Sequence, residues 1–174
     1  MKERRILIFT GNGKGKTTAA LGMALRASGH GMRVRIIQFI KNDDTTGEVN
    51  AIHNLPGVEL VQTGCGFIPP STSPAFAEHI KAAERGLKLA AAAVASGDYE
   101  LVVLDEICTA VAYGLFVESD VTDIMQAATR SICLVMTGRA ATPKMIELAD
   151  TVTEMNCLKH AFEAGLPAQK GVEY

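Results

Sequence analysis

The sequence predicts an α/β fold, a single domain in which a mostly parallel sheet is flanked by helices. Short apolar runs of strand length alternate along the chain with segments of helical character. One of these runs, residues 34–39, is apolar enough to be buried on both faces of a parallel sheet. The chain has 174 residues, 48% of them hydrophobic and 21% charged, which is enough for one ordinary core. We therefore expect one domain over residues 1–174.

The first half of the chain alternates between predicted strands and helices. A strand is expected at Ile6–Phe9, where an apolar run stops at a glycine-rich loop. The helix that follows includes residues 19–25 and ends where Gly29-His-Gly31 interrupts it. The apolar run Val34–Phe39 predicts a second strand. After a polar loop and a short amphipathic stretch, a third strand is expected at Val58–Val61.

The second half begins with an irregular loop, because residues 63–70 contain two glycines and two prolines. A long helix with apolar residues at helical spacing then covers about 74–96, and Gly97 closes it. The tail from Lys159 is expected to wrap the surface. The remaining predicted elements are strands at 101–104, 132–136 and 151–155, and helices at 120–129 and 143–148.

Composition and charge argue against several classes of protein. The net charge of −2 gives no electrostatic argument for binding nucleic acid or an anionic membrane. The apolar run Leu89–Ala95 is far shorter than a membrane span. The apolar residues that follow Met1-Lys-Glu-Arg-Arg are too few for a secretory signal. We therefore expect a cytoplasmic protein with neither nucleic acid nor membrane as a partner.

The loop after the first predicted strand indicates a phosphate-binding site. Residues 10–18 read Thr-Gly-Asn-Gly-Lys-Gly-Lys-Thr-Thr, so a strand, a glycine-rich turn and a helix opening on Gly-Lys-Thr form a P-loop. Lys16 would neutralise a phosphate, the hydroxyl of Thr17 can bind Mg²⁺, and the helix N-terminus attracts the anion. Thr10 stands where the general motif has its first glycine. The expected ATP-binding residues of this P-loop NTPase (RecA-like) domain are Gly11, Asn12, Gly13, Lys14, Gly15, Lys16, Thr17 and Thr18.

Two acidic residues, Asp105 and Glu106, follow the predicted strand 101–104 as in a Walker-B segment. In parallel sheets ligands bind at the carboxyl ends of strands, so we expect this pair near the P-loop. One carboxylate can bind Mg²⁺ while the other orients water or serves structure. Arg139, after the strand 132–136, is either a clamp for a terminal phosphate or a solvated arginine. Apart from Glu106 no catalytic base is evident, so the residues alone indicate an ATP- and Mg²⁺-binding protein.

The chain resembles the ATP:corrinoid adenosyltransferase family, the P-loop type that forms adenosylcobalamin. The P-loop with Gly11 as its first glycine carries the resemblance, together with seven further blocks in the family's order. These are Val34–Lys41, which ends Gln-Phe-Ile-Lys, Gly47–Glu48, Val102–Glu106, Thr137-Gly-Arg139, Leu148-Ala-Asp-Thr-Val-Thr-Glu-Met155, Lys159-His-Ala-Phe-Glu-Ala-Gly165 and Ala168-Gln-Lys-Gly-Val-Glu-Tyr174. The resemblance implies that the Co(I) centre of a reduced corrinoid attacks the 5′ carbon of ATP and releases triphosphate. The nucleophile then belongs to the corrinoid, so the protein needs no base.

The resemblance also implies roles for individual residues. Lys16 and Glu106 are the expected catalytic residues, and Mg²⁺ is expected on Thr17 and Glu106, with Asp105 as a further candidate. Family members often hold the corrinoid with a phenylalanine and a tryptophan in the loop matching residues 63–67, which displaces the lower cobalt ligand. This chain has no tryptophan, so Phe67 is the expected corrinoid contact and Ile68 a second candidate.

The implied partners are an electron donor such as a flavoprotein and a second copy of the chain in a homodimer. Two other functions stay open at this point. One is a P-loop kinase or ATPase that releases ADP. The other is a corrinoid-binding paralogue without turnover, which the altered loop at 63–67 suggests.

Overall fold

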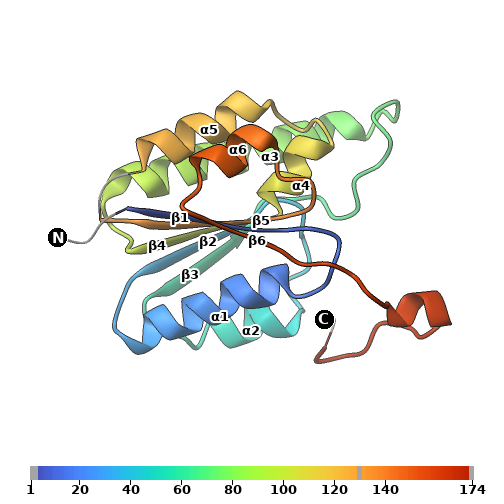
Figure 1. Ribbon diagram of the computed structural model, residues 1–174, viewed down its shortest axis with the longest axis horizontal. Coiled ribbons are helices and arrows are strands. Elements are labelled where there is room, and N and C mark those ends of the chain that lie inside the picture. The colour runs from blue at the N-terminus through green and yellow to red at the C-terminus, as the bar shows by residue number, and fades with distance from the viewer. Residues whose placement is uncertain (1–3, 129–130, 173–174) are drawn as a thin grey trace.

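A computed structural model of the protein describes residues 4–128 and 131–172. Six strands form one sheet in the order β3-β2-β4-β5-β1-β6, and every pair of neighbours is parallel. The helices cover both faces, with α1 and α2 on one face and α3, α4, α5 and α6 on the other (Figure 1). The prediction of an α/β fold with a mostly parallel sheet flanked by helices is confirmed.

The strands are β1 (Arg5–Thr10), β2 (Val34–Gln38), β3 (Val58–Gln62), β4 (Leu101–Asp105), β5 (Cys133–Thr137) and β6 (Thr151–Glu154). The helices are α1 (Lys16–Gly29), α2 (Gly47–Ile52), α3 (Phe76–Ser96), α4 (Ile107–Ala112), α5 (Glu118–Ala127), α6 (Pro143–Leu148) and the 3₁₀ helix η1 (Ala161–Ala164). Among the described residues, no helix combines the length and apolar character that a membrane span requires.

Two hydrophobic clusters, one on each face of the sheet, form the core. Successive strand residues point to opposite faces, and β4 shows the result. Val102 and Leu104 belong to the cluster under α3 and α5, whereas Leu101 and Val103 belong to the cluster under α1. All five residues of β4 are buried. An apolar run without alternation is therefore the sequence of a strand that is covered on both faces.

The register of the central strands brings their carboxyl ends to one edge of the sheet. β5 lies between β1 and β4, with Phe9 opposite Thr137 and Leu104 opposite Met136. The P-loop follows β1, Asp105 ends β4, and Thr137 ends β5. Residues from three distant parts of the sequence therefore meet at this edge.

The predicted elements are all present, with ends shifted by a few residues, but the helix α4 and the 3₁₀ helix η1 were not predicted. α4 follows Glu106 directly, and its apolar sequence Ile-Cys-Thr-Ala-Val-Ala gives no amphipathic period by which a short helix could be recognised. The predicted helix at 120–129 is α5, and position 129 lies outside the described residues. Beyond β6 the tail runs outward to η1 and then turns back toward α2 (Figure 1).

Candidate active site

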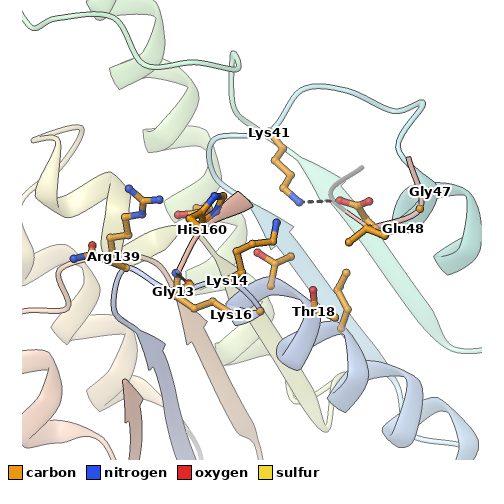
Figure 2. Close-up of a pocket in the computed structure, with 16 residues that line it drawn as sticks. Gly13, Lys14, Lys16, Thr18, Lys41, Gly47, Glu48, Arg139 and His160 are labelled. Atoms are coloured by element: carbon orange, nitrogen blue, oxygen red, sulfur yellow. Dashed lines mark hydrogen bonds and ion pairs between the residues drawn. The ribbon is translucent and has the colours of Figure 1, made fainter. Parts of the chain in front are cut away.

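A cavity of about 450 Å³ opens at the carboxyl edge of the sheet, above the P-loop (Figure 2). Five separate parts of the chain form its wall: the P-loop with the start of α1, the segment from Lys41 to the start of α2, Glu106 after β4, Arg139 after β5, and the tail. The lining residues are Asn12, Gly13, Lys14, Gly15, Lys16, Thr17, Thr18, Leu21, Lys41, Gly47, Glu48, Glu106, Arg139, His160, Gly171 and Val172. Basic side chains outnumber acidic ones, so the cavity suits an anion.

The P-loop is fixed in place by the chain that follows β6. The N–H of Gly13 donates to the carbonyl of Met155 (2.6 Å), and the N–H of Met155 donates to the carbonyl of Thr10 (2.8 Å). A Cβ at Gly11 or at Gly13 would lie 2.5 or 2.7 Å from the Met155 carbonyl oxygen. Both positions therefore require glycine.

The same packing explains why Thr10 replaces the first glycine of the general motif. Thr10 is still part of β1, where it pairs with Glu154 of β6. Its hydroxyl accepts a hydrogen bond from the N–H of Ala141 (3.2 Å). The close approach of Met155 begins one residue later, at Gly11, where φ is +93°. The first glycine is needed where the backbone of residue 155 crosses the loop.

Lys16 lies at the base of the cavity and its ammonium group is held by the loop itself. The Nζ atom donates to the carbonyl oxygens of Gly11 (2.8 Å) and Gly13 (2.6 Å), and the residue is only 8% exposed. Burial lowers the pKa of Lys16 below its usual value and the charge of Arg139 acts in the same direction, while Glu106 and Asp105 oppose the shift. An anion in the cavity would therefore meet a cation that is poorly solvated and weakly neutralised.

Asp105 is fully buried and orients the first turn of α1. Its Oδ1 atom accepts from the hydroxyls of Thr17 (2.8 Å) and Thr137 (2.6 Å), and its Oδ2 atom accepts from Nε2 of Gln38 (3.0 Å). It does not line the cavity, so its effect on a ligand passes through Thr17. The carboxylate and hydroxyl oxygens gathered here are the hard donors that Mg²⁺ prefers.

Glu106 occupies a different position from its neighbour. Its backbone is left-handed, with φ of +64°, and its N–H donates to the hydroxyl of Thr137 (2.9 Å). The side chain lines the cavity and accepts a hydrogen bond from the hydroxyl of Thr109 (2.5 Å). One of the two adjacent acids thus faces the cavity while the other supports Thr17 from below.

Three cavity residues were not assigned a role from the sequence: Lys41, Glu48 and His160. Lys41 donates to Glu48 (2.8 Å), and its Nζ atom lies 4.0 Å from Oδ2 of Asp105 (Figure 2). Burial alone would raise the pKa of Glu48, but the hydrogen bond and charge of Lys41 outweigh it and lower that pKa. Lys41 lies in the connection after β2 and Glu48 in the first turn of α2, and only the family blocks pointed to them.

His160 is the residue that brings the tail into the cavity. It is partly buried, whereas the other residues between 156 and 172 are exposed. Its Nδ1 atom accepts a hydrogen bond from the N–H of Phe162 (3.2 Å), so a neutral ring carries its proton on Nε2. Figure 2 shows the ring beside Arg139 at the mouth of the cavity.

The structure brings most of the predicted site residues together, but not the predicted corrinoid contacts. The P-loop residues 12–18, Glu106 and Arg139 all line the cavity. Phe67 and Ile68 do not, and they differ from each other. Phe67 is 93% exposed, whereas Ile68 is 8% exposed and packs in the larger hydrophobic cluster. Of the two, only Phe67 presents a side chain that a ligand can contact.

Comparison with known proteins agrees with this site. A family model described as ATP:corrinoid adenosyltransferase BtuR/CobO/CobP matches residues 2–174. A corrinoid adenosyltransferase from Pseudomonas aeruginosa is 45% identical over 170 residues, which are 97% of this chain and 83% of that protein. A corrinoid adenosyltransferase from Escherichia coli K12 is 39% identical over 174 residues, covering 97% of this chain and 85% of its own length.

Among solved structures, the flagellar accessory protein FlaH from Methanocaldococcus jannaschii is similar, with a TM-score of 0.55 and 12% identity. The match covers 88% of this chain and 70% of that one. A likeness at this identity shows the fold alone, and it confirms the predicted α/β, RecA-like P-loop class.

Proposed function

The chain belongs to the ATP:corrinoid adenosyltransferase family, and we propose that it moves the 5′-deoxyadenosyl group of ATP to the Co(I) centre of a reduced corrinoid. The cobalt electron pair forms the new bond to C5′. The bond between C5′ and the phosphate oxygen breaks, and its electron pair leaves with triphosphate. No proton has to be removed from either substrate, so the reaction needs charge stabilisation and not a base.

The observation that carries this proposal is the state of the two acids that line the cavity in the described part of the chain. Glu48 is bound to Lys41 and Glu106 to Thr109. A kinase or an ATPase needs a group that orients a hydroxyl or a water against the terminal phosphate. Here Glu48 pairs with Lys41, and Glu106 gives one oxygen to Thr109 and keeps the other for a metal ion. Lys16, Lys41 and Arg139 surround the space for an anion. A cationic cradle for a leaving triphosphate fits this arrangement.

The residues also fit Mg²⁺, which when bound would neutralise charge on the leaving triphosphate. The hydroxyl of Thr17 is the expected ligand from the P-loop, and Glu106 is the expected carboxylate. Asp105 holds the Thr17 hydroxyl at 2.8 Å and so fixes its direction. We expect Arg139 to contact the phosphate end of ATP, because it lines the same cavity.

Product analysis tests the proposal. Anaerobic incubation with Co(I) cobalamin, ATP and Mg²⁺ should yield triphosphate and the spectrum of an adenosylated corrinoid. Formation of ADP in its place would make the protein a kinase or an ATPase. Binding of ATP and corrinoid with no spectral change under reducing conditions would indicate a paralogue that has lost turnover.

We further propose that the loop at residues 63–67 holds the corrinoid. The exposed ring of Phe67 is the support for this, because a side chain that is 93% exposed is free to lie against an apolar ligand surface. An apolar ring against the lower face of the corrinoid would keep the axial ligand away from cobalt. Cobalt without that ligand is easier to reduce from Co(II) to Co(I).

Phe67→Ala should therefore separate reduction from transfer. With a weak reductant of the physiological type, we expect almost no adenosylated corrinoid to form, because the lower ligand or water returns to Co(II). With chemically pre-reduced Co(I) much of the rate should return, because the cavity is untouched. Both rates are measured from the absorbance of the adenosylated corrinoid.

The control for this variant is stability. A ring that is 93% exposed contributes little packing, so the melting temperature should stay near that of the wild type. Equal losses in both assays with a lower melting temperature would make Phe67 a loop anchor. Unchanged rates in both assays would indicate that another residue of the loop contacts the corrinoid.

The homodimer, the flavoprotein donor and the cytoplasmic location stay predictions from the sequence. The tail supports the first of them, since Leu158 is 97% and Phe162 78% exposed and a second copy of the chain would cover such side chains. Sedimentation equilibrium decides it, and a monomer at micromolar concentration would contradict the homodimer.

A further inference from the structure

One short segment, Gln38–Lys41, contacts both the nucleotide cavity and the loop at 63–67. The side chain of Gln38 binds Asp105, and the side chain of Lys41 lines the cavity. The backbone of the same segment holds the loop. The carbonyl of Gln38 accepts from the N–H of Thr63 (3.0 Å), and the carbonyl of Ile40 accepts from the N–H of Gly66 (2.8 Å).

The side chain of Gln38 is fully buried, and its amide must take one orientation. Asp105 can only accept, so Nε2 of Gln38 faces it at 3.0 Å. The Oε1 atom is then left to accept from Nε2 of Gln62, at 2.9 Å. Gln62 therefore donates to Gln38, Gln38 donates to Asp105, and Thr17 donates to the same carboxylate from the other side. Nε2 of Gln62 also donates to the carbonyl of Asp43 (3.1 Å). Glutamate or methionine at position 38 cannot make both contacts, because neither can donate and accept at once.

The loop at 63–67 lies directly on this segment. A Cβ built on Gly64 would be 2.1 Å from the carbonyl carbon of Ile40, so the two backbones are in direct contact. Gly66 adopts a φ of +86°, which directs its N–H to the Ile40 carbonyl. The loop cannot keep these contacts if Ile40 moves. Well-packed contacts of this kind transmit displacement instead of absorbing it.

Filling the cavity would disturb this segment at two points. A cation on the hydroxyl of Thr17 would compete for the charge of Asp105 and weaken its hold on Gln38. A triphosphate would attract Lys41, which lies 2.8 Å from Glu48 and 4.0 Å from Asp105 before the ligand arrives. Both changes act on the segment Gln38–Lys41, in which the carbonyls of Gln38 and Ile40 hold the loop.

We propose that Gln38 is a positioning residue that couples binding of ATP and Mg²⁺ at the P-loop, through Asp105, to the conformation of residues 63–67. The corrinoid site then takes its final shape only once the triphosphate site is filled. The role of this loop toward corrinoid rests on the proposed function, but the coupling itself needs no corrinoid. ATP and Mg²⁺ alone must change the loop, and they do so by binding its two conformations with different affinity.

Cys65, a partly buried thiol inside the loop, reports this change. The experiment measures its alkylation rate by iodoacetamide in the full chain, resolved by peptide mass spectrometry, with and without ATP and Mg²⁺. Cys157→Ser serves as background, because Cys157 is the exposed cysteine. In this background the nucleotide should change the Cys65 rate by about fivefold or more.

Gln38→Met should remove the nucleotide effect on Cys65 and raise the KM for corrinoid more than it lowers kcat. Gln126→Met, an exposed position on α5, is the matched control and should keep the effect. A purely structural role for Gln38 would lower stability without changing the nucleotide response of the thiol.

Gln62→Met keeps the test valid if Gln38→Met folds poorly. This variant removes the hydrogen bond from Gln62 to Gln38 and leaves every hydrogen bond of Asp105 in place. We expect ATP affinity within about twofold of wild type and a lost response of Cys65. If ATP and Mg²⁺ still change the Cys65 alkylation rate in both folded variants, the proposal is overturned. It is also overturned if they do not change that rate in the wild type. Absence of adenosyl transfer with an intact thiol response would instead overturn the proposed function.

Discussion

Lys16→Ala should abolish turnover, with a loss in kcat/KM on the order of a hundredfold or more. The leaving triphosphate would lose the cation that the cavity places beneath it. Lys16 is 8% exposed, and its ammonium donates to the carbonyl oxygens of Gly11 and Gly13. Incoming phosphate oxygens can replace these neutral acceptors and gain the full charge of the lysine. The rate is measured with pre-reduced Co(I), which removes the reduction step from the comparison.

Lys144→Ala is the matched control for this change. Lys144 is an exposed cation on α6 that pairs with Glu147 at 3.0 Å, and we expect its removal to leave the rate unchanged. The melting temperature of Lys16→Ala must also be compared, because two loop carbonyls lose their donor. A folded Lys16→Ala protein within a few-fold of the wild-type rate would contradict the role of the P-loop as triphosphate cradle.

The sequence predicted the sheet and the P-loop because both depend on short-range patterns. Apolar runs such as Val102–Leu104 can be recognised wherever a strand is covered on both faces, and the glycines at 11, 13 and 15 precede a helix. The sequence could not show why Thr10 replaces the usual glycine. That reason lies in Met155, which crosses the loop from a strand that is more than a hundred residues away in the sequence.

The rest of the cavity could not be predicted for the same physical reason. Lys41 and Glu48 reach it because β2 lies beside β4. His160 reaches it from the tail before η1, and Gly171 and Val172 reach it because the tail turns back after η1. No local pattern encodes these approaches, since each depends on where a different strand ends. The family blocks contained all of these residues, but a block of sequence does not show where its residues lie in the folded protein. Only tertiary packing assigns them to the cavity.

The roles of the adjacent acids Asp105 and Glu106 could not be predicted from the sequence either. In the sequence, Asp105 and Glu106 are two carboxylates at a strand end, and spacing does not separate their roles. The structure does so by ending β4 at Asp105 and turning Glu106 into a left-handed conformation with φ of +64°. Asp105 therefore stays among buried hydroxyl and amide donors. Glu106 leaves the sheet and faces the cavity.

Because Glu106 faces the cavity and Asp105 does not, we expect the second large effect on activity from a change at Glu106. Glu106→Gln should raise the Mg²⁺ concentration for half-maximal activity by about tenfold or more, because a neutral amide replaces the carboxylate that faces the ligand. Its melting temperature should change little, since the side chain keeps an oxygen for the Thr109 hydroxyl. The measurement is a Mg²⁺ titration of the initial rate at saturating ATP and pre-reduced corrinoid.

Asp105→Asn is the paired variant and should behave differently. Its amide nitrogen would meet either the hydroxyls of Thr17 and Thr137 or the amide of Gln38, all of which now donate to the carboxylate. One buried donor is then left facing another, which costs about 1–3 kcal/mol of folding stability. The expected result is a lower melting temperature with a smaller shift in the Mg²⁺ titration than for Glu106→Gln. If only Asp105→Asn shifts that titration, the two roles are reversed, and the metal is controlled from below through Thr17.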